Sequence, residues 1–490
     1  MAWFFSALLL CVSSSSFARD NERPAKAILV IRGVTIIDVA RGTTLEAMTV
    51  VVEDDRITEV GKVDAVAIPK NAMVIEVKGK LLIPGLWDMH AHVEAEAILP
   101  LFVGNGVTGV RHMFTGSPLN PPVKDWGKEV ARGKRIGPRI VATTRAIDGL
   151  NGDKPAAAGH PIVATTPEEG RAAVKTLRDA GDDFVKVYPF LNPEVFFAVL
   201  DEAARGPRKL PVAGHVPHLV SAAEASDRGM RSMEHCYGVL LCCSKEEEKL
   251  RKELAAAVKS GAMVGDTLDS TGAWRNQVKA MDSYDPTRAA ELFKKFVKND
   301  TWQVPTLISR KTWASLGDPK FTDDPRKAYL PLHVRTTWFQ RMKGGGVQFP
   351  LFGDIRLSPG DLANQKLLFQ AHMKLVGAMN KAGVKILAGT DTPVPYCFPG
   401  SGVHDELELL VKAGLTPAEA LRTATLNPPI FLDRLRDHGT VEKGKLADLV
   451  LLEANPLEDI NNVRKIETVI LGGRLFSKME IEKMAHGEKP

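Results

Sequence analysis

Features that would point to several other protein classes are missing from this sequence. No apolar run approaches the roughly 20 residues that a membrane-spanning helix needs. Cysteine occurs only 5 times in 490 residues, and no two cysteines have the CxxC spacing of a structural zinc site. The net charge is only +5, and lysine and arginine form no basic block. A membrane span, a thiolate zinc site and nucleic-acid binding are therefore not expected.

The N-terminus has the pattern of a secretory signal. Residues 3–12 form an apolar run too short to cross a bilayer, and the serine tract that follows ends in residues 16–18 (SFA), a small-x-small cleavage pattern. The usual lysine or arginine before the run is absent, and Cys11 follows Leu10 where a lipoprotein signal has a small residue. We expect residues 1–18 to be a signal peptide and the mature protein to be secreted or periplasmic.

The other cysteines leave a disulfide open. In an oxidising compartment Cys397 could pair with Cys242 or Cys243, but these thiols and that of Cys236 could equally stay buried and unpaired. Spacing alone does not choose between these alternatives.

The chain alternates two kinds of segment. Short β-branched runs occupy residues 27–80 and return at 439–477, which predicts one small β-domain built from both ends of the chain. Between them strand-like and helical segments alternate. The candidate strands are residues 85–93, 106–113, 138–146, 183–189, 210–216, 231–236, 302–308 and 385–391. Such a series is typical of a (β/α)₈ barrel, although a doubly wound sheet would give a similar count.

We therefore predict an α/β fold with two domains after the signal. Residues 85–436 would form a (β/α)₈ TIM barrel, and residues 19–84 and 437–490 would form a small composite β-sandwich domain. Two connections in the barrel are long, a helical one at 239–301 and another at 310–384. Insertions of this length over a barrel mouth often shape substrate access.

Metal-competent side chains lie near the ends of the candidate strands. In PGLWDMHAH, His90 and His92 are separated by one residue, so both imidazoles lie on one face of a strand and can meet one metal ion. Later strands carry Lys186 in FVKVY, His215 in GHVP, His235 in MEH and Asp391 in AGTD. Lys186 is the most informative, because an ammonium group is costly to bury in an apolar strand. Structural roles remain as alternatives, such as a core histidine or, for Asp391, a helix cap.

These motifs resemble the amidohydrolase superfamily, and within it the imidazolonepropionase-like group of metal-dependent dipeptidases and of prolidase- and ochratoxin-type amidases. The resemblance rests on PGLWDMHAH, VKVY, GHVPH, MEH, LAGTDTP and the closing stretch from NPPIFL to GTVEKGKLADLVLLEANPL. The closing stretch is similar to the composite β-domain of that superfamily, and the motifs extend over nearly the whole chain after the signal.

The resemblance implies a binuclear metal centre. The ligands would be His90, His92, Lys186 carbamylated by CO₂, and Asp391 for one ion, and Lys186, His215 and His235 for the other. A hydroxide bridging the ions would be the nucleophile, and Asp391 would take its proton and deliver it to the leaving nitrogen. Imidazole and oxygen ligands without thiolate favour zinc, with manganese or cobalt as alternatives.

Other polar residues near the strand ends are candidates for substrate contacts. They are Arg111, His112, Arg145, Tyr188 and His218, which could bind a substrate carboxylate or carbonyl. Relatives often have an aspartate at the position of His112, so this histidine changes the charge near the pocket. Each of these residues also has a structural alternative, as do His160 and His404 in nearby loops. Glu234, beside His235, is expected to face away from the site as a structural residue, with a hydrogen bond to a metal ligand as the alternative.

The expected function is metal-dependent hydrolysis of a C–N amide bond in a small substrate, either a dipeptide or an N-acyl amino acid. One alternative is a cyclic-amide hydrolase or deaminase of the same fold with a single metal ion. The second alternative is a catalytically silent barrel that binds a ligand. The resemblance makes Lys186 the residue that separates the first two functions, because single-metal relatives typically lack a working lysine at this position. Whether copies of the chain associate stays open.

Overall fold

The computed structural model describes residues 28–488, with gaps in this range. The gaps are 115–120, 152–153, 156–160, 261–272, 317, 319–320, 322, 343–345, 350–352 and 357. The predicted signal peptide and His160 lie outside the described residues. Within the described part of the chain, every helix is too short or too polar to span a bilayer.

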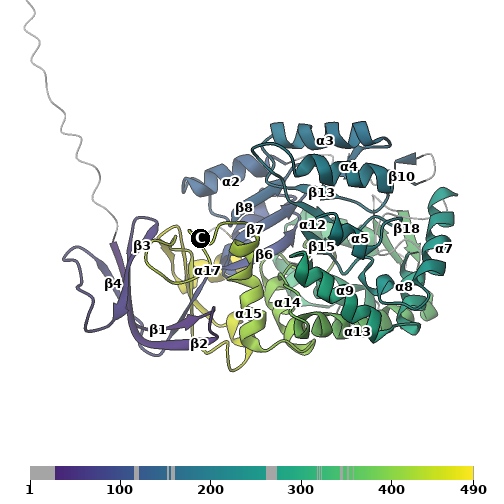
Figure 1. The fold of residues 1–490 in the computed structure, drawn as a ribbon. Helices are drawn as coiled ribbons and strands as arrows, with labels where there is room; N and C mark the ends of the chain where they lie inside the picture. The colour runs from purple at the N-terminus through teal and green to yellow at the C-terminus, as the bar shows by residue number, and fades with distance from the viewer. Residues whose placement is uncertain are drawn as a thin grey trace, which may run out of the picture.

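One eight-stranded sheet joins the two ends of the chain (Figure 1). Its strands are β1 (Ile28–Asp38), β2 (Thr43–Glu53), β3 (Arg56–Lys62), β4 (Met73–Glu76), β5 (Leu81–Pro84), β19 (Leu449–Leu452), β20 (Ile466–Leu471) and β21 (Arg474–Phe476). The strand order is β21-β20-β19-β5-β1-β2-β3, and β4 pairs with β1. β5 and β19 pair antiparallel, so a strand from each end of the chain meets in the middle of the sheet. The domain borders near residues 84 and 437 stay a prediction.

The middle of the chain alternates parallel strands with helices. One parallel sheet contains β6 (Leu86–Ala91), β7 (Val107–Met113) and β8 (Arg139–Thr143). A second contains β12 (Ile162–Val163), β9 (Ala146–Asp148), β13 (Val185–Val187), β14 (Val212–Gly214), β15 (Ser232–Glu234) and β16 (Trp302–Val304). These strands lie inside the candidate segments from 85–93 to 302–308, apart from β12 and the end of β9.

The last candidate strand, residues 385–391, is not a regular strand but connects the two parallel sheets. Leu387 N donates to Gln303 O at 2.9 Å, and Met89 N donates to Ala388 O at 2.8 Å. This segment therefore lies between β16 and β6. Asp391 at its end is brought next to His90 and His92 at the end of β6.

Helices accompany the strands of the middle region and of the C-terminal segment. They are η1 (Glu96–Ile98), α1 (Leu99–Gly104), α2 (Val123–Ala131), α3 (Pro167–Asp179), α4 (Pro193–Ala203), α5 (Ala222–Asp227), α14 (Ser401–Lys412), α15 (Pro417–Ala424), α16 (Asn427–Phe431), η4 (Ile460–Arg464) and α17 (Lys478–Ala485). The start of α3 is fixed by a capping box between Thr166 and Glu169.

The two long connections are largely helical in their described parts. The first contains α6 (Val239–Cys242), α7 (Glu247–Lys259), α8 (Ala273–Asp282) and α9 (Pro286–Lys298). The second contains α10 (Leu307–Ala314), η2 (Pro325–Tyr329), α12 (Leu332–Met342), the hairpin of β17 (Gly346–Phe349) and β18 (Gly353–Arg356), and α13 (Pro359–Lys381). The short pair β10 (Leu150–Asn151) and β11 (Lys154–Pro155) follows β9. Trp338 of α12 donates to the carbonyl of Pro393 at 2.8 Å, so the second insertion packs on the loop after Asp391.

The four described cysteines are free, buried thiols. Of the two alternatives left open by the sequence, the structure therefore has unpaired thiols, and Cys397 contacts Thr312 rather than Cys242 or Cys243. Burial raises the pKa of the Cys236 thiol to about 12, which keeps it in the unreactive protonated form.

Candidate metal centre

His90 and His92, at the end of β6, each have one ring nitrogen in a hydrogen bond. His90 Nδ1 lies 2.7 Å from Glu234 Oε2, and His92 Nδ1 contacts the carbonyl oxygen of Phe114. Because both partners accept, each Nδ1 carries the proton and each Nε2 keeps a lone pair. Both Nε2 atoms lie 3.2 Å from Asp391 Oδ1. The two imidazoles thus present lone pairs toward one carboxylate oxygen.

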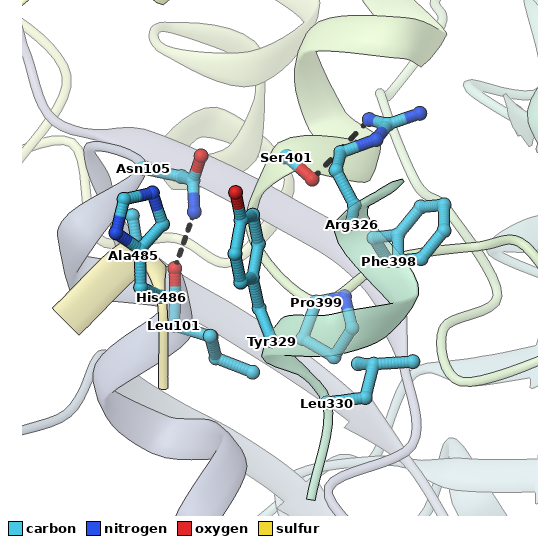
Figure 2. Close-up of a pocket in the computed structure, with 10 residues that line it drawn as sticks. All are labelled: Leu101, Asn105, Arg326, Tyr329, Leu330, Phe398, Pro399, Ser401, Ala485 and His486. Atoms are coloured by element: carbon cyan, nitrogen blue, oxygen red, sulfur yellow. Dashed lines mark hydrogen bonds between the residues drawn. The ribbon is translucent and has the colours of Figure 1, made fainter. Parts of the chain in front are cut away.

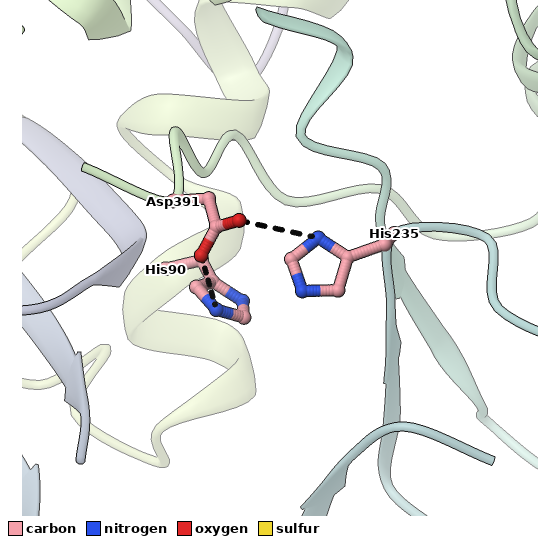
Figure 3. Close-up of side chains that lie close together, drawn as sticks. All are labelled: His90, His235 and Asp391. Atoms are coloured by element: carbon pink, nitrogen blue, oxygen red, sulfur yellow. Dashed lines mark ion pairs between the residues drawn. The ribbon is translucent and has the colours of Figure 1, made fainter. Parts of the chain in front are cut away.

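His235 and Asp391 complete a compact buried cluster with His90 (Figure 3). The ring centroids of His90 and His235 are 4.5 Å apart, and His235 Nδ1 lies 4.0 Å from Asp391 Oδ2. These three residues can bring their ligand atoms within 4.8 Å of one another. His235 has a φ of 60° and Asp391 a φ of 64°, conformations that non-glycine residues adopt only rarely.

Lys186 and His215 lie beside this cluster on the next strands. The ring centroids of His215 and His235 are 5.0 Å apart. Lys186 is only 1% exposed, and its Nζ lies 5.1 Å from the centre of the Tyr188 ring, which in turn meets the His215 ring at 4.9 Å. The structure therefore brings all of the predicted ligands into one continuous group of side chains. Their role in holding metal stays a prediction.

The protonation states of the group suit metal ligands. Burial lowers the pKa of His215 and His235 well below the ordinary value, so both imidazoles are neutral and keep a lone pair. Neutral imidazoles with an ionised carboxylate form a donor set that zinc prefers.

Two ring nitrogens show that a cation fits here. His90 Nε2 and His215 Nδ1 are buried and have no hydrogen-bond partner among the described residues. A buried polar atom without a partner is costly, and a metal ion bound to each nitrogen would offset this cost. His90 Nε2 also faces an oxygen of Asp391 at 3.2 Å, an acceptor opposite an acceptor, which a cation between them would stabilise.

Glu234 supports the centre, which corrects the prediction that it faces away. Its Oε2 accepts from His90, and its Oε1 accepts from Arg111 Nη2 at 2.8 Å and from Ser232 Oγ at 2.7 Å. Burial alone would raise the pKa of Glu234, but Arg111 and His90 lower it to about 2. The charged pair of Glu234 and Arg111 on two apolar strand segments was the signal in the sequence that could have identified this contact.

Arg111 lies in the core beneath the centre. Its Nε donates to Met89 O at 2.6 Å, its Nη1 donates to Ser232 Oγ at 3.0 Å, and its guanidinium lies over the rings of Phe184 and Phe431. The side chain is fully buried. The core thus encloses the guanidinium, and a contact of Arg111 with substrate stays a prediction.

Two of the histidines predicted to contact substrate are buried and neutral. Val93 N donates to His112 Nδ1 at 3.0 Å, and burial lowers the pKa of His112 to about 3. His218 lies 3.3 Å from the hydroxyl of Tyr237, and burial lowers its pKa to about 3. The structure thus favours the alternative that His112 packs in the wall of the fold.

The remaining candidates differ in their position. Tyr188 is partly exposed and borders both Lys186 and His215, so it lies at the rim of the centre. Arg145 is exposed, and its Nη2 donates to Pro161 O at 3.2 Å. His404, expected in a loop, lies in the first turn of α14, with Nε2 at 2.9 Å from Asn105 O.

A cavity of about 190 Å³ lies apart from this group of side chains (Figure 2). It is lined by residues of α1, η2, the start of α14 and the end of α17. None of the predicted metal ligands lines it. The candidate centre is therefore defined by converging side chains and not by this cavity.

Comparison with known sequences matches only part of the chain. Residues 332–476 match the amidohydrolase family. Ochratoxinase from Aspergillus niger is 37% identical over 119 residues, which are 23% of this chain and 24% of ochratoxinase. Imidazolonepropionase from Geobacillus kaustophilus (strain HTA426) is 36% identical over 102 residues, or 19% of this chain and 23% of that protein. The chain thus matches about a quarter of the length of these curated relatives.

Solved structures match almost the whole chain. Bottromycin amidohydrolase has a TM-score of 0.69 at 23% identity and covers 96% of this chain and 92% of its own. A putative prolidase from Bifidobacterium longum has a TM-score of 0.61 at 24% identity and covers 92% and 94%. The fold is therefore that of the amidohydrolases, and the predicted resemblance to that superfamily is confirmed. The motifs predicted the same group of relatives that the comparisons find: ochratoxinase, imidazolonepropionase and prolidase-like structures.

Proposed function

We propose that this protein is a metal-dependent amidohydrolase that cleaves the C–N amide bond of a dipeptide or an N-acyl amino acid. The observation that carries the proposal is that Nε2 of His90 and Nε2 of His92 each lie 3.2 Å from the same oxygen of the buried Asp391. Relatives named as an amidohydrolase and as prolidases support an amide substrate.

We also infer that the parallel strands close into a (β/α)₈ barrel. Pairing runs without a break from β6 to β8 and from β9 to β16. Asp183 N donates to Ala142 O at 2.9 Å, which joins β8 to the start of β13, and residues 385–391 join β16 to β6. The candidate ligands would then all lie at the carboxyl ends of the strands, where barrels place their active sites.

The residues of the chain fit two divalent ions, with zinc as the first choice. The ligands would be His90, His92, Lys186 and Asp391 for one ion and Lys186, His215 and His235 for the other. When bound, such ions lower the pKa of water and polarise the scissile carbonyl. A carbamate formed from CO₂ on Lys186 would turn this buried cation into an anionic ligand. Without it, an ammonium group at this place would repel both ions.

Asp391 is the residue placed to move the proton. Its carboxylate lies against His90, His92 and His235, and Ser309 Oγ donates to its Oδ2 at 3.2 Å. It takes the proton of the attacking water and passes it to the leaving nitrogen. Tyr188 at the rim and the exposed Arg145 are the remaining candidates to bind the substrate. The signal at residues 1–18 would place this reaction outside the cytoplasm.

Metal content tests the proposal. Elemental analysis of protein purified without chelator and with bicarbonate should give two divalent ions per chain. Lys186→Ala should lose about one ion and its hydrolysis of dipeptides and N-acyl amino acids. Lys445→Ala is the matched control, because Lys445 is also buried but donates to Leu435 O away from the centre.

The other outcomes of this measurement separate the alternatives. A single ion in the native protein, unchanged in Lys186→Ala, would favour a cyclic-amide hydrolase or deaminase with one metal ion. No bound ion after reconstitution with zinc, manganese or cobalt would show that the proposed centre does not exist.

A further inference from the structure

Two hydroxyl side chains at the start of α10 contact the candidate metal ligands. Thr306 Oγ1 lies 2.6 Å from His235 Nδ1, and Ser309 Oγ donates to Asp391 Oδ2 at 3.2 Å. Both hydroxyl residues are buried, and neither belongs to a motif that the sequence singles out. One turn of helix therefore touches a ligand from each of two different strand ends.

The backbone at Thr306 is held in an unfavourable conformation. Its φ is 47° and its ψ is 51°, a left-handed conformation that is costly for a β-branched residue. The two ligands near it, His235 and Asp391, also have positive φ values. Strain of this kind persists only where the surrounding structure imposes it, and it concentrates at functional sites.

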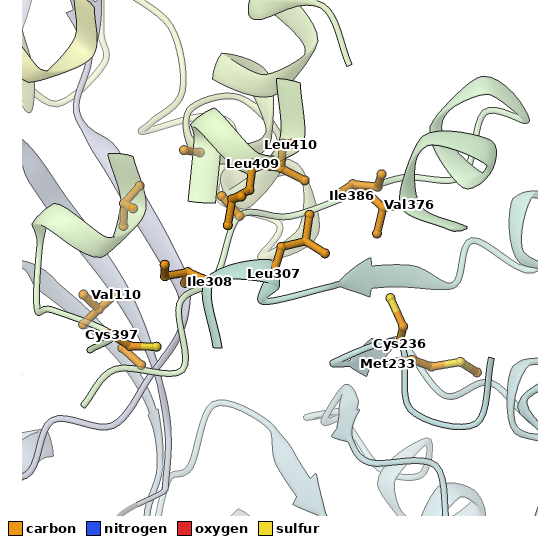
Figure 4. Close-up of a cluster of buried hydrophobic side chains, with 14 of the residues drawn as sticks. Val110, Met233, Cys236, Leu307, Ile308, Val376, Ile386, Cys397, Leu409 and Leu410 are labelled. Carbon is orange, nitrogen blue, oxygen red and sulfur yellow. The ribbon is translucent and has the colours of Figure 1, made fainter. Parts of the chain in front are cut away.

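A buried carboxyl group on α14 holds this turn in place. Glu406 accepts from Leu307 N at 2.9 Å and from Ile308 N at 2.8 Å, and its side chain is fully buried. It therefore caps the first turn of α10 from another helix. The side chains of Leu307 and Ile308 pack in the same apolar cluster as Leu409 and Leu410 of α14 (Figure 4). The position of Thr306 and Ser309 is thus fixed by α14.

We propose that Thr306 and Ser309 are positioning residues for the metal centre. Thr306 accepts the Nδ1 proton of His235, which leaves Nε2 of that ring as the metal-binding atom. Ser309 holds Oδ2 of Asp391, so that Oδ1 stays toward His90 and His92. This inference rests on the proposed metal function and adds the residues that set the orientation of two of its ligands.

The test compares isosteric variants by metal affinity and by spectrum. Thr306→Val keeps the branched shape and removes the hydroxyl, whereas Thr306→Ser keeps the hydroxyl. Thr312→Val is the control, because the hydroxyl of Thr312 on the same helix contacts only Ile308 O, Pro395 O and Cys397 in the described structure. Each apoprotein is titrated with zinc against a chelating dye, and its cobalt form is recorded by visible absorption.

We expect Thr306→Val and Ser309→Ala each to bind the affected ion about 10- to 100-fold more weakly than the native protein. Their cobalt absorption bands should shift, and Thr306→Ser and Thr312→Val should match the native protein. If Thr306→Val fails to fold, Ser309→Ala still tests the helix turn.

Several results would overturn the inference without touching the proposed function. Native affinity and spectrum in both Thr306→Val and Ser309→Ala would show that the hydroxyls do not position the ligands. An equal loss in Thr312→Val would show that any buried hydroxyl of α10 has the same effect. A native protein that binds neither zinc nor cobalt would instead overturn the proposed function itself.

Discussion

Replacing Glu234 by glutamine should damage both the stability and the metal affinity of this protein. The carboxylate accepts from Arg111 and Ser232 on one oxygen and from His90 Nδ1 on the other. A glutamine has one donating and one accepting end. If its amide nitrogen faces Arg111, two donors oppose each other. If it faces His90, the ring proton must move to Nε2, and the lone pair for the metal is lost.

The size of the effect on stability follows from the pKa of Glu234. Although burial opposes ionisation, Arg111 and His90 lower this pKa from 4.5 to about 2. A folded-state pKa below the unfolded value stabilises the fold above pH 4.5, and this contribution is lost as the pH falls from 4.5 to 2. The difference is worth about 3 kcal/mol at neutral pH. Leaving the buried charge of Arg111 without its partner raises the expected loss to about 3–5 kcal/mol.

Urea unfolding at pH 7.5 and zinc competition measure the two effects of Glu234→Gln. The affinity for zinc should fall about 10- to 100-fold, because His90 loses its fixed orientation. Glu202→Gln is the matched control. Glu202 is also buried and pairs with Arg178 at 3.0 Å, away from the metal ligands, so this variant should lose stability but keep its zinc affinity. Native stability and native zinc affinity in Glu234→Gln would refute the reasoning.

Two further predictions concern residues next to the centre. Asp148 is buried at the end of β9, and burial raises its pKa from 3.8 to about 7. The stability that the neutral group contributes below pH 4 is therefore lost as the pH rises to 7. In urea unfolding, Asp148→Asn should be more stable than the native protein at pH 8, by up to about 4 kcal/mol, and should show little gain at pH 4.5. An equal gain at both pH values would contradict this. At Gly214, an added Cβ would lie 2.2 Å from Val187 O. Gly214→Ala should therefore lower the midpoint of thermal unfolding and reduce bound zinc below two ions per chain. The control is Gly206→Ala, which also has a positive φ but open space around the added Cβ, and it should keep its metal.

The sequence determined the elements and the list of candidate ligands. Period-two alternation places His90 and His92 on one face of β6, and an ammonium in an apolar strand singles out Lys186. Turn and capping patterns set the start of α3 and the turn between β2 and β3, where Asp54 has a φ of 54°. These features depend on residues close together in the chain, so they can be recognised without a tertiary structure.

Only the tertiary structure decided how these side chains are oriented. Glu234 was predicted to face away because neighbouring residues of a strand alternate, but the positive φ of His235 turns the chain so that both residues contact His90. Glu234 and Arg111 are 123 positions apart, and Thr306 and His235 are 71 apart. Alternation shows which residues share a face but neither how deeply a side chain is buried nor which distant strand end lies opposite. Those contacts are set by the packing of strands and helices, as α14 fixing the start of α10 shows.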